Sequence, residues 1–157
     1  MIPLTHTFYS LIGIDDAHLT TSPNYYYNPE VVLGLEEVMQ ETSDIISERD
    51  AHKINKHLPG YLTGMMWQLY YSRSRHGVSY NTLMRQSTRR GAFVILIRDE
   101  ASEIFGGFYS AELKLQSDGF TGDGESFLFG FAKNGFRHWP ATGNNPYFCR
   151  CYSEGIS

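Results

Sequence analysis

The chain has 157 residues, of which 41% are hydrophobic and 19% are charged, and these proportions are those of a single globular domain rather than a disordered chain. Its net charge of −4 argues against a nucleic-acid-binding protein, because such proteins normally carry a basic surplus or stripe. No stretch approaches the ~20 apolar residues that span a bilayer, and no basic region precedes an apolar run at the N-terminus. We therefore expect neither membrane insertion nor a signal peptide.

The first 28 residues lack a clean periodicity, and we predict that they form a tyrosine-rich N-terminal arm that docks on the core or on a neighbouring molecule. A helix is predicted after this arm, because Asn28 suits the N-cap position and Pro29 suits the first turn. A second helix is predicted from Ser47, where a pattern similar to a capping box begins, as far as Pro59. Both helices carry an apolar stripe and are expected to pack against a sheet.

From Trp67 onward, apolar residues recur at the period of two that is typical of half-buried strands. Ser79 suits the N-cap of a short helix. Phe93 to Ile97 is a continuous apolar run and is predicted to be a strand buried on both faces. Asn134-Gly135 predicts a tight hairpin turn. The predicted strands cover residues 67–72, 93–97, 103–110, 126–131, 136–139 and 147–152.

Helices come first in this order, and neighbouring strands follow with short turns. The order predicts an α+β fold, with an antiparallel sheet or sandwich flanked by helices. We assign residues 1–28 to the N-terminal arm and residues 29–157 to the domain. The core is expected to contain the apolar strand residues Trp67, Leu69, Val94, Leu96, Phe105, Phe127, Phe129 and Trp139.

The most distinctive segment runs from Gly122 to Phe129, where two glycines, two acids and a hydroxyl lead into an aromatic strand. Glu125 is the candidate acid, but as a general acid or base it would need a raised pKa and a substrate pocket. The interpretation we favour is structural: its carboxylate accepts backbone N–H bonds of the loop and holds the glycine turn. A pair of Glu125 with His76 is the only candidate for acid–base chemistry.

No metal or cofactor site is predicted from the remaining residues. Cys149 and Cys151 are two apart on a predicted strand and would point to the same face, where a disulfide would be strained. Two cysteines without further ligands make a poor zinc site, so we expect reduced thiols in a cytosolic compartment. His52 and His57 miss the i, i+4 spacing of a helical metal pair. Gly122 to Gly124 lacks the Lys-Ser/Thr of a phosphate loop.

An ordered series of short motifs links these segments, and its residues are Trp67, Ser72, His76, Gly77, Ser79, Phe105, Gly106, Gly122, Gly124, Glu125, Ser126, Phe127, Trp139, Gly143 and Asn145. In order and spacing the series resembles the TLDc domain, the TBC/LysM-associated domain of the oxidation-resistance proteins. The resemblance covers about Ser43 to Ser157. The family's closing glycine-rich strand and the strands after it are absent. We therefore expect an incomplete sheet that another chain or the segment Phe8 to Tyr27 covers, or a fragment of a longer protein.

The resemblance implies a non-enzymatic domain that binds other proteins, with the vacuolar-type proton ATPase as the leading partner and a link to oxidative-stress resistance. It implies a cytoplasmic protein that reaches organelle membranes through a protein partner, and it carries over no catalytic residues. Two alternatives stay open: a structural or accessory subunit of a larger assembly, and an enzyme that uses Glu125 and His76. A pocket joining these two side chains would favour the enzyme, whereas their separation would favour the interaction domain.

Overall fold

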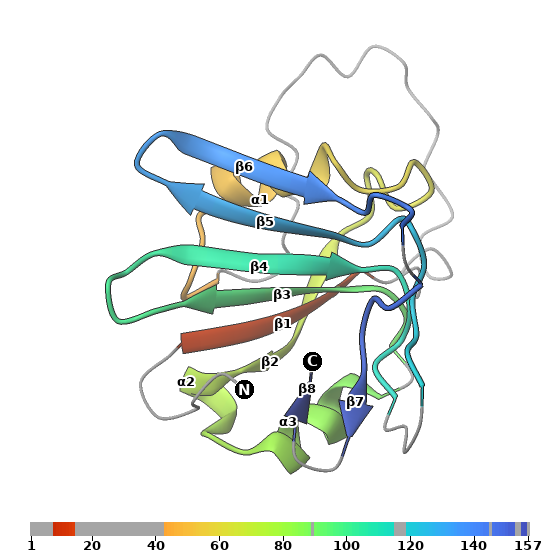
Figure 1. Cartoon of the computed structure of the whole chain (residues 1–157). Helices are drawn as coiled ribbons and strands as arrows, with labels where there is room; N and C mark the ends of the chain where they lie inside the picture. Colours follow the sequence, from red (N-terminus) through yellow and green to blue (C-terminus); the bar gives the residue numbers. More distant parts are fainter. Residues whose placement is uncertain are drawn as a thin grey trace, which may run out of the picture.

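The computed structural model is built on one antiparallel sheet of six strands, with helices at its back and at its lower edge (Figure 1). A separate two-stranded hairpin lies beside the lower helices. The description covers residues 8–14, 43–88, 90–114, 119–144, 146–152 and 155–156, with residues 8–14, 152 and 155–156 described by their backbone.

The elements follow one another as β1 (Phe8–Ile14), α1 (Glu48–Asn55), β2 (Trp67–Ser72), α2 (Arg73–His76), α3 (Tyr80–Ser87), β3 (Phe93–Arg98), β4 (Ile104–Tyr109), β5 (Phe127–Ala132), β6 (Gly135–Pro140), β7 (Cys151–Tyr152) and β8 (Gly155–Ile156). The strand order in the sheet is β2-β1-β3-β4-β5-β6, and every neighbouring pair is antiparallel. The predicted α+β fold class is therefore confirmed.

An N-terminal segment contributes a strand to the interior of this sheet. β1 pairs with β2 on one side and with β3 on the other, and Ser10 lies opposite both Ser72 and Leu96. Sequence analysis placed this segment in the arm, because a glycine at position 13 and a register shift between Leu11 and Ile12 disturb the period of two. The rest of the arm and the predicted helix that follows Asn28 lie outside the described residues.

Local capping signals account for the described helices. The Ser47 side chain accepts a hydrogen bond from the backbone N–H of Asp50 at 3.2 Å, and α1 begins at the next residue, as predicted. The Ser79 side chain caps α3 in the same way. The short helix α2 was not predicted; Ser72 caps it at the end of β2. These caps satisfy backbone donors that the first turn leaves unpaired.

The sheet has two apolar faces, and different elements cover them. The inner face packs against α1, and its cluster includes Ile54, Trp67, Val94 and Phe129. Figure 1 shows α1 behind β5 and β6. On the outer face, a second cluster joins β3 and β4 to α3 and to the two cysteines. This second cluster covers the lower strands, whereas the outer face of β4, β5 and β6 has no described layer above it.

The hairpin predicted at Asn134-Gly135 is confirmed, and Gly135 takes the positive φ of 108° that the turn requires. The predicted strand over residues 147–152 is shorter in the structure, where β7 contains Cys151 and Tyr152 alone. The segment before β7 diverges because Cys149 forms an isolated antiparallel bridge with Thr121.

Six of the eight predicted core residues join the inner cluster: Trp67, Val94, Leu96, Phe127 and Phe129 are buried, and Leu69 is half-buried against them. The prediction is wrong for Phe105 and Trp139, whose exposed fractions are 39% and 52%. Both side chains belong to the outer face, which α1 does not reach. For the same reason Ile95 and Ile97 of β3 are only half-buried.

Candidate functional site

The glycine-rich loop before β5 is held by Asp123. The Oδ1 atom of Asp123 accepts hydrogen bonds from the Ser110 hydroxyl at 2.7 Å and from the backbone N–H of Glu125 at 3.0 Å. The backbone N–H of Ser126 donates to the carbonyl of Asp123 at 3.1 Å. Sequence analysis gave the role of backbone acceptor to Glu125, and the structure corrects this assignment, because the carboxylate that accepts a backbone N–H of the loop is that of Asp123.

Glu125 instead connects this loop to the turn that follows α1. Its Oε2 atom accepts a hydrogen bond from the hydroxyl of Tyr61 at 2.7 Å. This hydrogen bond raises the pKa of Tyr61 to about 12. The contact joins residues that are 64 positions apart in the chain. Glu125 therefore links two loops at the surface.

His76 and Glu125 lie at opposite ends of the sheet. Ser72 and Phe129 share one row across β2, β1, β3, β4 and β5, and these four strand spacings span roughly 19 Å. His76 lies beyond one end of this row, and Glu125 precedes β5 at the other end (Figure 1). The acid–base pair that the enzyme alternative requires is therefore not formed.

His76 has a local structural role. Its Nδ1 atom accepts a hydrogen bond from the backbone N–H of Ser72 at 3.0 Å, and its ring stacks on Tyr71 with ring centroids 5.3 Å apart. The Tyr71 hydroxyl donates to the carbonyl of Gly77. These contacts close the corner between β2 and α3, where Ser79 begins the helix.

Two glycines of the motif series allow close approach of neighbouring groups. A Cβ atom at Gly106 would lie 1.9 Å from the carbonyl oxygen of Ile95 on the adjacent strand. Gly122 has a φ of 95°, and a Cβ atom there would lie 2.4 Å from the ring of Tyr109. A side chain at either position would therefore clash with its neighbour, which explains why glycine stands there.

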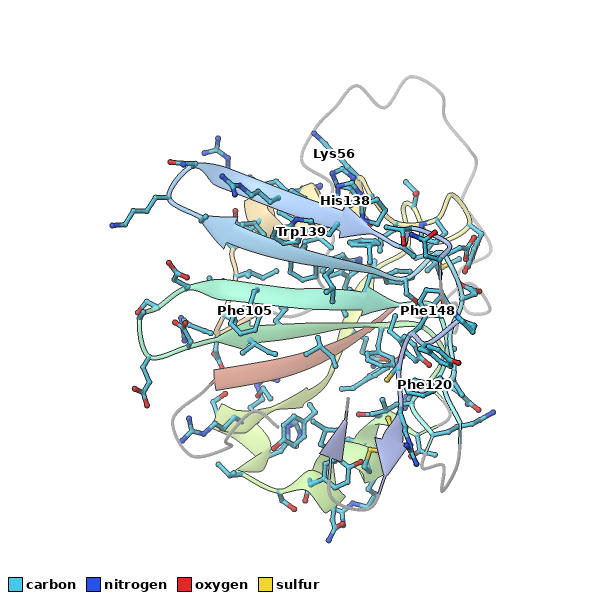
Figure 2. The ribbon with its side chains drawn as sticks, viewed as in Figure 1. Lys56, Phe105, Phe120, His138, Trp139 and Phe148 are labelled. Atoms are coloured by element: carbon cyan, nitrogen blue, oxygen red, sulfur yellow. The ribbon has the colours of Figure 1, made fainter. Side chains whose placement is uncertain are left out.

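The outer face of the upper strands forms an open apolar surface. We call it the open face and define it by the outward side chains Ile95, Ile97, Phe105, Leu128 and Trp139. The exposed fraction of Leu128 is 64%, the largest of the five. A cavity of about 730 Å³ lies on this face and continues to Phe148 and Cys149. Figure 2 labels Phe105, Trp139 and Phe148 around it.

Exposed apolar patches of this kind mark interaction sites in soluble proteins. Sequence analysis missed the open face. Alternating apolar residues predict strands, but they do not indicate which face of the sheet another layer covers. Cross-strand register explains how the patch forms: Leu128 lies opposite Gly107 on β4 and opposite Trp139 on β6. Gly107 leaves room on β4 for the side chain of Leu128, whose Cδ2 atom would lie 3.1 Å from a Cβ atom at that position.

A sequence model of the TLDc domain matches residues 39–157. This chain belongs to the TLDc domain family. It is 35% identical over 113 residues to oxidation resistance protein 1 of Homo sapiens, which covers 71% of this chain and 13% of that protein. It is 37% identical to the Xenopus laevis protein of the same name over the same length. It is 31% identical over 141 residues to nuclear receptor coactivator 7 of Homo sapiens, covering 89% of this chain and 15% of that protein.

The structure describes three of the four remaining motif residues of this TLDc domain. Gly124 and Ser126 belong to the loop that Asp123 holds, and the Ser126 hydroxyl accepts a hydrogen bond from the backbone N–H of Ser110. Gly143 lies after β6 and lines the cavity. Asn145 lies outside the described residues. The described motif residues from Phe105 onward thus gather around the cavity and the loop before β5. His76 and its neighbours form a separate corner, and Trp67 lies in the inner cluster.

Two further properties of the TLDc domain follow from the described residues. None of its described helices is long and apolar enough to cross a membrane. Among the side chains that the structure describes, no group of three or more His, Cys, Asp or Glu is placed to hold a metal ion.

Proposed function

We propose that this TLDc domain is a non-enzymatic interaction domain that binds the vacuolar-type proton ATPase and acts in oxidative-stress resistance. Membership of the TLDc family supports the proposal, and the relatives named oxidation resistance protein 1 support the link to oxidative stress. The ATPase is the partner that the family resemblance implies. Through it, the domain works in the cytoplasm at the surface of organelles.

The observation that carries the proposal is the open face. Leu128 and Trp139 lie side by side on β5 and β6 and are both more than half exposed. Burial of a large apolar side chain contributes about 1.5–3 kcal/mol of favourable free energy, so a partner that covers these two residues gains binding free energy from them. Tryptophan is also among the side chains that most often dominate a protein interface.

The test measures the affinity of the purified domain for the purified ATPase by biolayer interferometry. Leu128→Ser and Trp139→Ser should each weaken binding by about tenfold or more, which is the effect expected of a residue at the centre of an interface. Val78→Ser is the matched control, because Val78 is 48% exposed but lies between α2 and α3, away from the cavity. If the wild type and the three variants bind with equal affinity, the open face is not part of the interface. If none of the four proteins binds, the proposal that the ATPase is the partner is wrong.

A second function is favoured by the same surface: a structural or accessory subunit of a larger assembly. A cavity of about 730 Å³ on an uncovered sheet is also what a subunit presents to a permanent neighbour. Affinity purification from cytosol and from membranes distinguishes the two. Recovery of ATPase subunits supports the interaction domain, whereas a different complex of fixed stoichiometry supports the assembly subunit.

A further inference from the structure

Two buried thiols meet at the edge of the cavity. Cys149 and Cys151 are both free and buried, and their sulfur atoms lie 4.0 Å apart. Cys149 lines the cavity, and both cysteines belong to the buried cluster on the outer face. A molecule held in the cavity therefore lies beside Cys149, whose sulfur atom is 4.0 Å from that of Cys151.

The surroundings of the two sulfur atoms are unequal. The hydrogen bond from Cys151 lowers the pKa of Cys149; burial opposes this effect, and a hydrogen bond from Tyr109 adds to it. The same contact and burial raise the pKa of Cys151. Burial raises the pKa of Tyr109 to about 12, so its hydroxyl keeps its proton and remains a donor. Since Cys149 lines the cavity, Cys149 is the attacking sulfur, and the Cys151 thiol, 4.0 Å away, is the proton donor.

We propose that Cys149 is a peroxide-reactive thiol that reduces an organic hydroperoxide held in the cavity, with Cys151 as the resolving thiol. The Cys149 thiolate attacks the terminal oxygen of the hydroperoxide, and the O–O bond breaks. Cys149 becomes a sulfenic acid, and the alkoxide takes the proton of Cys151 and leaves as an alcohol. The Cys151 thiolate then attacks the sulfur of Cys149, an S–S bond forms, and the hydroxide released becomes water with the proton that Cys149 first gave to solvent.

The cavity walls select the class of hydroperoxide. The residues that line the cavity include Phe93, Phe105, Trp139 and Phe148. Such walls bind an apolar group better than water or hydrogen peroxide. A volume of about 730 Å³ also falls in the range of sites that hold small organic molecules. The substrate class is therefore an aryl or alkyl hydroperoxide.

The spacing of the cysteines makes the product a local, reducible disulfide. The sulfur atoms must close from 4.0 Å to the bond length of about 2.05 Å. Two cysteines only two residues apart close a very short loop, so their disulfide is strained, and strained disulfides are the labile ones. The reaction is stoichiometric, with one hydroperoxide consumed per chain, so it is a redox response of a binding domain rather than enzymatic turnover.

The test exposes the full, reduced chain to cumene hydroperoxide or hydrogen peroxide and follows the thiols by differential alkylation and peptide mass mapping. We expect an intramolecular Cys149–Cys151 disulfide in a monomer, formed about tenfold faster with cumene hydroperoxide because burial of its apolar group adds to binding. Cys151→Ser should leave a sulfenic acid on Cys149 that dimedone traps. Cys149→Ser should leave Cys151 unoxidised. Circular dichroism checks that both variants fold.

Three results would overturn the proposal: thiols that stay reduced while glutathione in the same tube is oxidised, disulfides only between chains, or dimedone labelling of Cys151 instead of Cys149. A rate with hydrogen peroxide equal to that with cumene hydroperoxide would refute the selection by the cavity. None of these readouts involves a protein partner, so the proposal stands or falls separately from binding of the ATPase.

Discussion

At the scale of single residues, the contact between Tyr61 and Glu125 shows how one hydrogen bond positions a loop. The bond joins the turn after α1 to the loop before β5, and its geometry holds the phenol in its protonated form. The Glu125 carboxylate thus bonds a side chain from another loop, while its own backbone N–H donates to the carboxylate of Asp123. The role of Glu125 as a structural anchor rather than a catalyst stays a prediction.

We predict that Glu125→Gln returns the pKa of Tyr61 from about 12 toward its ordinary value of 10. Because the native pKa is raised, the hydrogen bond contributes stability that is fully present below pH 10 and is lost as the pH rises to about 12. Ultraviolet difference titration of the wild type against Tyr61→Phe isolates this tyrosine among the others. An unchanged Tyr61 titration in Glu125→Gln would show that the carboxylate is not its partner.

Gly106 gives a sharper test of packing. Gly106→Ala places a methyl group 1.9 Å from the carbonyl oxygen of Ile95, so β3 and β4 must move apart. We expect a loss of about 1–3 kcal/mol or more in the free energy of unfolding, measured by urea denaturation. Gly124→Ala is the matched control, because nothing lies within 4 Å of its Cβ position. A Gly106→Ala protein as stable as this control would contradict the close approach.

At the scale of elements, the end of α1 is joined to β6 by stacked histidines. The ring centroids of His57 and His138 lie 4.1 Å apart, and Figure 2 shows Lys56 and His138 in the same region. Partial burial lowers the pKa of His57, and the charges of His138 and Lys56 lower it further. The stack therefore favours the neutral ring.

We predict that acid weakens this junction. Since the native pKa of His57 is lowered, its contribution to stability is present above pH 6.5 and is lost as the pH falls below that value. Urea denaturation across this range should show a steeper decline for the wild type than for His57→Gln. NMR titration should place the pKa of His57 nearer its ordinary value in His138→Gln. Parallel stability curves would contradict this account.

Local signals made α1 and α3 predictable, whereas contacts between distant segments were not. Ser47 and Ser79 predict helix starts because a cap depends on residues within one turn. The strand β1 was missed because its pairing with β2 and β3 depends on partners that lie more than fifty residues away. The choice of Asp123 over Glu125 as the loop acceptor depends on where Ser110 lies at the end of β4.

At the scale of the whole molecule, one sheet carries two unequal faces. The inner face is closed by α1, and the lower part of the outer face is closed by α3 and the cysteine segment. Sequence analysis offered the segment Phe8 to Tyr27 as a cover for an incomplete sheet. Its first part, Phe8–Ile14, is instead a strand within the sheet. Trp139 shows why exposure was not predictable: the sequence pattern marks it as apolar, but only the layer above decides whether it is buried.

The central claim is that the open face is the surface at which a protein partner binds. Hydroxyl-radical footprinting read by mass spectrometry tests it most directly, because it reports the exposure of individual side chains. In the free chain Trp139 should be oxidised much faster than the buried Trp67, and binding of the ATPase should protect Trp139 and Leu128 but not Val78. A Trp139 that reacts as fast in the complex as in the free chain would contradict the claim.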